Sequence, residues 1–264
     1  MVVEWTELET SLGVVARLRN MEMYTPKEAQ DSETVLPEPR WPQSGSVVFD
    51  NIEAAYNTNC DPVLRNVSFK VEAGQKAAIC GRIGSTISTT IMSRTLLRSH
   101  LNIIPQEPIL FLGSVRMNAI PFISSLSSFK DNNIITALTI VGFWTIIYSR
   151  GGLDADMSSI PLSEGQKQLF CLARALLRRD KCPILVLDEA KSNTDHHTDE
   201  QMQRIIREEW KDKTVIAVVH KLKTVMDCDG IAVLEKGGLV EFDAPAELLK
   251  REGGVFKGLW DSQR

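Results

Sequence analysis

The stretch AICGRIGSTIST, residues 78–89, approaches the pattern of a phosphate-binding loop. In that pattern, G-x-x-x-x-G-K-[ST], backbone N–H groups cradle phosphates, the lysine neutralises their charge and the hydroxyl binds Mg²⁺. Gly81 stands at the first glycine and Ser88 at the hydroxyl position, but Thr86 replaces the second glycine and Ile87 the lysine. An intact ATP site, a damaged one and a chance match all remain open from this stretch alone.

Both replacements act against phosphate binding. Without the lysine, the loop loses a charge-assisted hydrogen bond worth about 1.5–3 kcal/mol. The β-branched Thr86 resists the positive φ that a glycine adopts where a backbone curls around phosphates. Weak or absent ATP binding by the isolated chain is therefore expected.

Two acids follow an apolar run further along the chain. In ILVLDEA, four apolar residues lead to Asp188 and Glu189. The carboxyl edge of a parallel sheet is where open α/β folds bind their ligands. Asp188 can hold Mg²⁺ there through water, and Glu189 can orient or deprotonate an attacking water. Taken alone, the pair is equally compatible with a strand that ends in two solubilising acids.

The stretch PLSEGQKQLFCLARALL, residues 161–177, begins like a helix with an anion site at its N-terminus. Ser163 offers a hydroxyl, and Gly165 offers a backbone N–H that no side chain obstructs. The structural alternative is a plain helix with Ser163 as its N-cap. The LDEA stretch downstream favours the anion site, because paired motifs support each other.

Alternating strands and buried strands are predicted around these residues. The stretches at 47–56 and 63–71 alternate like antiparallel strands, and 76–80 leads into the glycine loop. The continuous apolar runs at 183–189 and 215–220 are typical of a parallel sheet that is buried on both faces.

The remaining predicted elements are short. Residues 88–97 read as a helix, and residues 102–106 as a strand that ends at Gln106. The run LFCLARALLRR predicts a helix with one apolar face, formed by Leu169, Leu172, Ala173 and Leu176. Residues 230–242 predict a hairpin over Lys236, Gly237 and Gly238, and Asp243 is predicted to cap a last helix.

Composition and charge narrow the function classes. The chain has 264 residues, and its net charge of −4 gives no general basis for nucleic-acid binding. The cysteines lack C-x-x-C spacing and are odd in number, which predicts reduced, buried thiols: Cys60, Cys80, Cys171, Cys182 and Cys228. No signal peptide is expected. Residues 132–149 carry no charge, but their polar residues predict two short buried helices rather than a membrane span.

Three segments are expected along the chain. Residues 1–23 predict an amphipathic helix, whose apolar stripe is Trp5, Leu8, Leu12, Val15 and Leu18. This helix either packs on its own domain or docks onto something outside the chain. Residues 24–46, rich in proline, predict a linker, and residues 47–264 a compact domain.

Together, LSEGQ and LDEA resemble the signature and Walker B motifs of ATP-binding cassette (ABC) proteins. The stretches GLDADMSS, QKQLFCLARALLRR and GGLVEFDAPAELL are similar to the second cassette of multidrug-resistance-associated, C-subfamily exporters. The stretch WTELETSLGVVARLRN resembles the segment just after the last membrane helix of that family. The resemblance covers nearly the whole chain.

The resemblance implies a role for each matching residue. The signature is Leu162, Ser163, Glu164, Gly165 and Gln166, and the D-loop aspartate is Asp195. The catalytic pair is Glu189 and His220, and the Mg²⁺ ligands are Ser88, Gln106 and Asp188. The ATP-binding set is Tyr56, Gly81, Arg82, Ile83, Gly84, Ser85, Thr86, Ile87, Ser88, Thr89, Gln106 and Asp188.

The fold implied by the resemblance is an α/β P-loop NTPase-type core. It has a mostly parallel sheet, an antiparallel β edge and a helical subdomain. Ser88 and Gln106 lie closer in sequence than the family places them, so part of the core segment is interpreted as deleted.

The function implied is that of the nucleotide-binding domain of an exporter of xenobiotics, conjugates or secondary metabolites. Its cofactors would be ATP and Mg²⁺. Its partners would be a transmembrane domain and a second cassette at the cytosolic face of a membrane. Because Ile87 replaces the lysine, two alternatives stay open: a non-hydrolytic partner-binding module and a truncated gene remnant.

Overall fold

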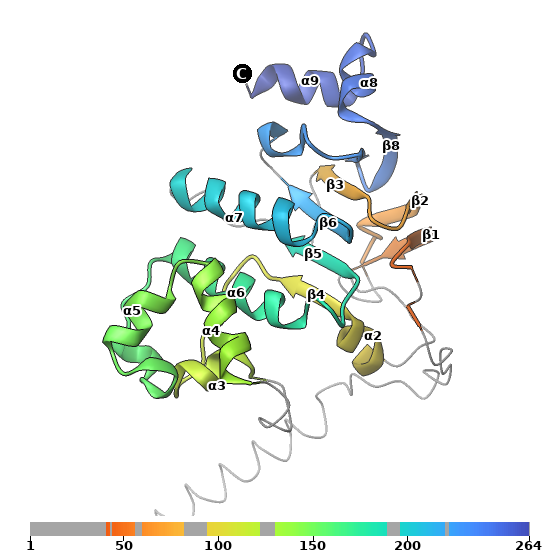
Figure 1. The fold of residues 1–264 in the computed structure, drawn as a ribbon. Helices are drawn as coiled ribbons and strands as arrows, with labels where there is room; N and C mark the ends of the chain where they lie inside the picture. Colours follow the sequence, from red (N-terminus) through yellow and green to blue (C-terminus); the bar gives the residue numbers. More distant parts are fainter. Residues whose placement is uncertain are drawn as a thin grey trace, which may run out of the picture. The chain divides into compact units, whose positions relative to one another are not determined.

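The computed structural model describes residues 41–42, 44–55, 60–81, 94–121, 130–188, 196–219 and 222–263 (Figure 1). Apart from Arg94, these residues belong to one compact unit, Pro37–Thr89 with Thr95–Arg264. The predicted helix at 1–23 and most of the predicted linker at 24–46 lie outside the described residues.

Eight strands are described: β1 (Val47–Ala54), β2 (Leu64–Val71), β3 (Lys76–Gly81), β4 (Leu101–Ile104), β5 (Ile184–Asp188), β6 (Thr214–Val219), β7 (Gly230–Glu235) and β8 (Gly238–Asp243). The described α-helices are α2 (Arg94–His100), α3 (Val115–Ala119), α4 (Asp131–Ile140), α5 (Trp144–Ser149), α6 (Glu164–Arg178), α7 (His196–Glu209), α8 (Pro245–Lys250) and α9 (Val255–Ser262). Short 3₁₀ turns are η2 (Gly152–Asp154), η3 (Met157–Ser159) and η4 (Leu222–Val225).

The main sheet has six strands in the order β4-β5-β6-β3-β7-β8. Every pair from β4 to β7 is parallel, and β7 with β8 forms an antiparallel edge. β1 and β2 form a separate two-stranded antiparallel sheet. The predicted α/β core with a mostly parallel sheet and an antiparallel edge is therefore confirmed.

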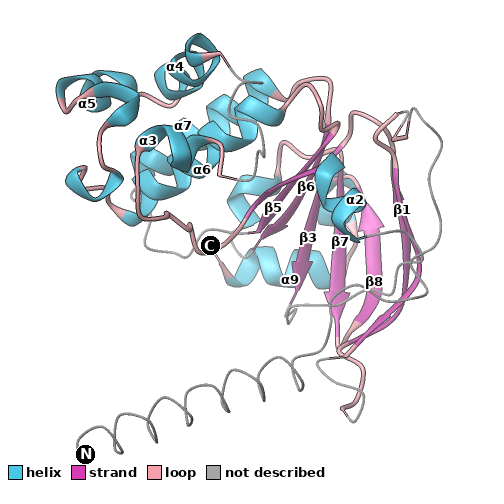
Figure 2. Cartoon of the chain, turned by 90° about the horizontal axis from the view of Figure 1, so that it is seen from below, coloured by secondary structure: helices cyan, strands magenta, loops and turns pink. Residues whose placement is uncertain are grey.

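The two faces of the main sheet are covered by different layers (Figure 2). Along β3, Ala78 and Cys80 join a core that includes Leu248 of α8 and Phe256 of α9. The alternate residues of the same strand, Ala77 and Ile79, pack with the β1–β2 sheet. This burial on both faces explains why the strand reads as a continuous apolar run.

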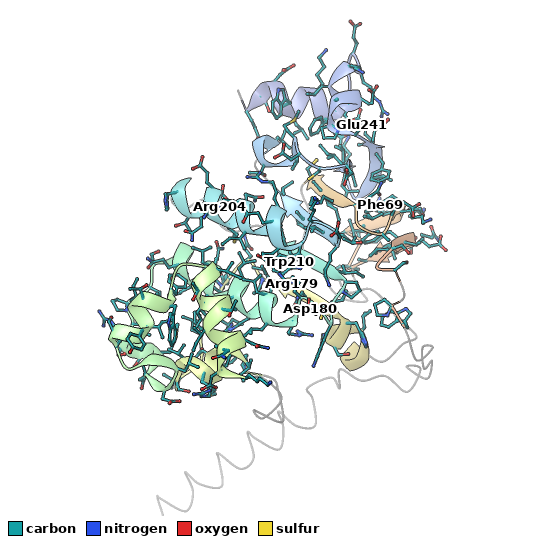
Figure 3. All side chains as sticks on the ribbon, in the orientation of Figure 1. Phe69, Arg179, Asp180, Arg204, Trp210 and Glu241 are labelled. Atoms are coloured by element: carbon teal, nitrogen blue, oxygen red, sulfur yellow. The ribbon has the colours of Figure 1, made fainter. Side chains whose placement is uncertain are left out.

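The largest core lies between the sheet, α6 and α7. It contains the apolar face predicted for the α6 helix, with Leu169, Leu172, Ala173 and Leu176 all buried. Trp210, just after α7, is fully buried in the same core (Figure 3). The helices α3, α4 and α5, here called the helical segment, add Val115, Ile134 and Ile147 to it.

Several predicted element boundaries can be compared with the structure. The predicted strand at 102–106 ends at Ile104, because Pro105 follows and has no N–H to donate. The predicted helix at 88–97 overlaps α2, which continues to His100. Two short helices lie within or close to 132–149, as predicted, and are α4 and α5. The predicted burial is wrong for α5, where Ile147 is buried but Ile146 and Tyr148 are exposed. Among the described helices, none has the length and apolar character needed to cross a bilayer.

The predicted C-terminal hairpin is confirmed as β7 and β8. The prediction that Asp243 caps the helix after it is wrong. The N-cap of α8 is Ala244, which makes no side-chain cap bond. Asp243 instead accepts a hydrogen bond from the N–H of Ala244 at 2.9 Å and pairs with Arg251 at 2.5 Å. Glu241, labelled in Figure 3, binds the first turn of α9, accepting hydrogen bonds from the N–H groups of Val255 and Phe256 at 3.2 and 2.9 Å.

The five cysteines are all free, and their environments differ. Cys80, Cys171 and Cys182 are buried and Cys228 is half-buried, whereas Cys60 is exposed. The prediction of buried thiols is therefore wrong for Cys60. Burial raises the pKa of the Cys80 thiol to about 12 and that of Cys228 to about 11.

We expect thiol reagents to distinguish Cys60 from the other cysteines. The thiolate is the reactive form, and raised pKa values keep Cys80 and Cys228 protonated at neutral pH. Maleimide labelling of the folded chain at pH 7.5, followed by mass spectrometry, should show a fast phase at Cys60. Cys60→Ser should remove this phase. Fast labelling of Cys80 in the folded chain would contradict the burial described here.

Candidate functional site

Three predicted site residues lie at one edge of the main sheet. Gln106 follows β4, Asp188 ends β5 and Gly81 ends β3. The strands β4, β5, β6 and β3 are adjacent and parallel, so their carboxyl ends meet at this edge. Adjacent strands lie about 4.8 Å apart, so the row from β4 to β3 extends over roughly 15 Å. This is the edge at which open α/β sheets bind ligands.

Strand register aligns the residues along this edge. Ile104 pairs with Leu187, and Asp188 pairs with Val218 of β6. β6 ends at Val219, one residue before His220 in the sequence. The Asp188 side chain is exposed, as is Gln106, so both are accessible from solvent.

Gly81 occupies a position that no other residue fits well. Its φ is +146°, and a Cβ built there would collide with the main-chain oxygen of Leu234 on β7. The glycine is therefore required by the close approach of β7, before any role in phosphate binding is considered.

The helix α6 begins with a complete capping box. The Ser163 hydroxyl accepts a hydrogen bond from the N–H of Gln166 at 3.3 Å. The Gln166 side chain returns this bond by accepting from the N–H of Ser163 at 2.9 Å. Ser163 is therefore the N-cap, as in the structural alternative given for this stretch, and the box fixes the start of the LSEGQ helix.

The charge at the start of α6 is balanced locally. Glu164 lies in the first turn, where the helix dipole favours a negative charge. Its carboxylate pairs with Lys167 at 2.7 Å, with side chains 67% and 33% exposed. Solvent screens such a pair, so it contributes little to stability.

Two side chains join α6 to β4 and to the segment that follows it. The Asn102 amide on β4 donates to the carbonyl of Ala175 at 2.9 Å. The Gln168 amide donates to the carbonyl of Gln106 at 3.3 Å. The first turns of α6 therefore lie beside Gln106, which places the LSEGQ helix at the same edge of the sheet.

Arg174 binds the segment that follows Gln106, residues 109–118. Its guanidinium donates to the carbonyls of Ile109 and Asn118 at 2.5 and 2.6 Å, and to the Asn118 side-chain oxygen at 3.3 Å. It also lies 5.7 Å from the ring centre of Phe111 and 5.4 Å from that of Phe170. One side chain of α6 thus fixes both ends of residues 109–118.

Backbone bonds connect the same segment to the loop that precedes α6. The N–H of Val115 donates to the carbonyl of Ala155 at 2.9 Å. The N–H of Met157 donates to the carbonyl of Gly113 at 2.9 Å. The chain after Gln106 and the chain before Ser163 are therefore joined directly.

Arg116 of α3 forms two ion pairs with other parts of the chain. Its guanidinium pairs with Asp131 at the start of α4 and with Asp154 at 3.2 Å. The hydrogen bond from Arg116 holds the pKa of the Asp131 carboxyl below its usual range. Asp156 likewise has a lowered pKa, because the Ser158 hydroxyl and N–H both donate to it.

The other predicted site residues lie outside the described residues: Tyr56, residues 82–89, Glu189, Asp195 and His220. Of the predicted set, the structure brings Gly81, Gln106 and Asp188 to one sheet edge, with Leu162–Gln166 at the start of the adjacent helix. Sequence reasoning missed Gln168 and Arg174. Their signal was present as polar residues that interrupt an apolar helical run.

The described edge suits Mg²⁺ with a nucleotide. Mg²⁺ takes oxygen ligands, and it is usually held by one or two carboxylates together with substrate phosphates and water. Asp188 offers a carboxylate and Gln106 an amide oxygen. Within the described ranges, no cluster of three or more His, Cys, Asp or Glu side chains could hold a metal.

Curated relatives of this chain are fungal transporters, although no family model matches it. ABC multidrug transporter B of Aspergillus fumigatus is 40% identical over 285 residues, covering 99% of this chain and 19% of that protein. ABC transporter ecdL of Aspergillus rugulosus is 38% identical, covering 98% of this chain and 19% of that protein. ABC transporter atnG of Emericella nidulans is 38% identical, covering 100% and 18%. The chain thus spans about a fifth of the length of these relatives.

A solved structure supports the fold. The structure described as a bacterial Atm1-family ABC exporter with ATP bound matches with a TM-score of 0.77 and 24% identity. The match covers 98% of this chain and 48% of that one. At this identity the match shows the α/β fold.

Proposed function

We propose that this chain, a homologue of one domain of fungal ABC transporters, works as the nucleotide-binding domain of an ABC exporter. The observation that carries the proposal is the shared edge of Gln106, Asp188 and the LSEGQ helix, with Gln168 contacting the carbonyl of Gln106 at 3.3 Å. The transported compound would be a xenobiotic, a conjugate or a secondary metabolite.

The proposed exporter needs parts beyond the described residues. Residues 1–23 would form a helix that follows a transmembrane domain. Residues 24–46 would link this helix to the nucleotide-binding domain, which residues 47–264 would form. A second cassette would complete the nucleotide sandwich at the cytosolic face of the membrane. The relatives support this arrangement, because they are named as transporters and are about five times longer than this chain.

Within the sandwich, the site residues of this chain would bind Mg²⁺ and the phosphates of ATP or position the attacking water. Asp188 and Gln106 would hold the Mg²⁺ that accompanies ATP, with Ser88 from the loop. Glu189 would orient the attacking water, and His220 would contact the terminal phosphate. Ser163 and the N–H groups at the start of α6 would meet the nucleotide that the second cassette holds. Bound Mg²⁺ supplies charge neutralisation on the phosphates.

This chain's own nucleotide site would be the weaker of the two. Ile87 and Thr86 remove the lysine and the second glycine of the loop. The alignment with ABC multidrug transporter B extends over 285 positions, more than the 264 residues of this chain, which supports a deletion relative to that protein. We place this deletion between Ser88 and Gln106. The deletion would leave one role intact, because Leu162–Gln166 would still contact the nucleotide that the second cassette holds.

The same replacement at Ile87 favours a second candidate function. A cassette that has lost the lysine can still bind a partner cassette or a membrane subunit without hydrolysing ATP. A third candidate is a remnant of a longer gene, which would have no nucleotide pocket. The three candidates differ in their response to repair of the loop.

Repair of the loop is the experiment that tests the proposal. In isothermal titration calorimetry with Mg²⁺, the unmodified chain should bind ATP weakly or not at all. The double variant Ile87→Lys, Thr86→Gly should bind about 10- to 150-fold more tightly, the factor expected for one restored charge-assisted hydrogen bond. The control Ile83→Lys, Thr86→Gly adds the same charge at a loop position where the motif specifies no residue type, and it should gain less.

Each outcome separates the candidates. Weak binding by the unmodified chain that tightens on repair would support the proposed nucleotide-binding domain. Binding by the repaired chain alone, with none by the unmodified chain, would favour a partner-binding module whose own nucleotide site no longer works. Micromolar binding by the unmodified chain, with turnover that is lost in Glu189→Gln, would show an active ATPase and contradict the weak site. An absence of binding in every variant would favour the remnant.

A further inference from the structure

Gln168 is a polar side chain in an apolar environment. It is 5% exposed and lies on α6 next to Leu169 and Phe170, which are also buried. Its amide nitrogen donates to the main-chain oxygen of Gln106 at 3.3 Å. Its amide oxygen is buried and has no hydrogen-bond partner among the residues that the structure describes. The assignment of the two amide atoms follows from the neighbour, because a carbonyl oxygen only accepts.

This arrangement costs stability in the form described. A buried acceptor without a donor loses its hydration and gains nothing in return, and a single 3.3 Å hydrogen bond compensates only in part. A leucine of similar size would fill the same space among apolar neighbours without that cost. The benefit of a glutamine at this position therefore has to come from the group to which it is hydrogen-bonded.

What Gln168 holds is the main chain of Gln106 itself. The Gln106 side chain is exposed, so its own packing does not fix its position. Gln168 holds its carbonyl, and Arg174 holds the carbonyl of Ile109 at 2.5 Å. Both bonds come from α6, so the segment after β4 is attached to the helix that Ser163 caps.

We infer that Gln168 is a positioning residue that keeps Gln106 aligned with the LSEGQ helix. This inference rests on the proposed function, in which Gln106 is a Mg²⁺ ligand. Movement of α6 toward a nucleotide then carries Gln106 with it, and the loss of Gln168 leaves the metal ligand free to move while the fold remains.

The first test is hydrogen–deuterium exchange on the full chain, comparing the unmodified protein with Gln168→Leu. The variant removes the bond to the Gln106 carbonyl and the unpaired acceptor together. We expect exchange in a peptide covering residues 106–111 to rise about threefold to tenfold, the range for the loss of one net hydrogen bond. The unfolding temperature should stay the same or rise, whereas a residue that only supports the fold would lower it.

A matched control is available on α7. Gln201 makes the same kind of bond, donating its amide to the carbonyl of Val141 at 3.2 Å. Gln201→Leu should leave exchange of residues 106–111 unchanged. Unchanged exchange in Gln168→Leu would overturn the inference, as would an equal rise in both variants.

The second test measures the metal response in the repaired chain, Ile87→Lys with Thr86→Gly. Adding Gln168→Leu should remove most of the gain in ATP affinity that Mg²⁺ produces, while Mg²⁺-free affinity stays constant. An unchanged Mg²⁺ gain would overturn the link to the metal. If the repaired chain binds no ATP, the proposed function fails instead, and the exchange comparison still decides whether Gln168 positions Gln106.

Discussion

With Arg174 replaced by methionine, the chain should lose about 2–4 kcal/mol of its free energy of unfolding. The guanidinium donates to two main-chain carbonyls and to the Asn118 side chain, and methionine can donate to none of them. The contacts with Phe111 and Phe170 add a cation–π contribution of about 0.5–1 kcal/mol. Urea unfolding followed by circular dichroism measures the loss.

Two variants check the cause of this loss. Arg174→Lys keeps the charge but lacks the planar fork that reaches several acceptors, so an intermediate loss is expected. Arg178→Met is the matched control, because Arg178 lies on the same helix and donates to the carbonyls of Arg98 and Ser99 at the surface. It should lose less than about 1 kcal/mol. Equal losses at both positions would show that the bonds to residues 109–118 are not the cause.

Replacing Trp210 by alanine should destabilise the chain by about 3–5 kcal/mol, the range for a fully buried large aromatic residue. Trp210 has no exposed surface and belongs to the core between the sheet, α6 and α7. The Arg179 guanidinium pairs with Glu209, the residue before Trp210. The size of the loss depends on how far the neighbouring core side chains move into the space that the indole leaves. Thermal and chemical unfolding both measure this effect.

Trp210→Phe separates the size of the ring from its polar group. The indole N–H of Trp210 is buried without a hydrogen-bond partner among the described residues. Phenylalanine removes this unpaired donor while it fills most of the space, so a loss of roughly 1 kcal/mol or less is expected. A loss as large as that of Trp210→Ala would mean that the N–H has a partner in solution.

Much of the fold could be predicted because its strands, turns and helix starts depend on residues that are neighbours in the sequence. The apolar runs that became β3, β5 and β6 are buried on both faces, and such burial leaves an uninterrupted apolar sequence. The Lys236-Gly237 turn was predictable because Gly237, with φ +84°, leaves no room for a Cβ beside the carbonyl of Val63. The start of α6 was predictable from Ser163 and Gln166, whose capping bonds involve only neighbours in sequence.

The bonds that join distant segments could not be predicted. Gln168 meets the carbonyl of Gln106, and Arg174 meets the carbonyls of Ile109 and Asn118. A main-chain carbonyl is present in every residue, so the sequence carries no mark of the acceptor. The cap of α9 was missed for the same reason, because Glu241 reaches it from β8 rather than from the preceding residue.

The position of β3 in the sheet has a consequence for how the chain folds during synthesis. β3 ends at Gly81, but its neighbours on both sides, β6 and β7, begin only at Thr214 and Gly230. A ribosome adding about 5–20 residues per second leaves both edges of this apolar strand without partners for roughly 7–27 s. Exposed apolar strand edges are templates for aggregation. The nascent chain therefore carries an unpaired apolar strand over that interval, and a translational pause before Thr214 would lengthen its exposure.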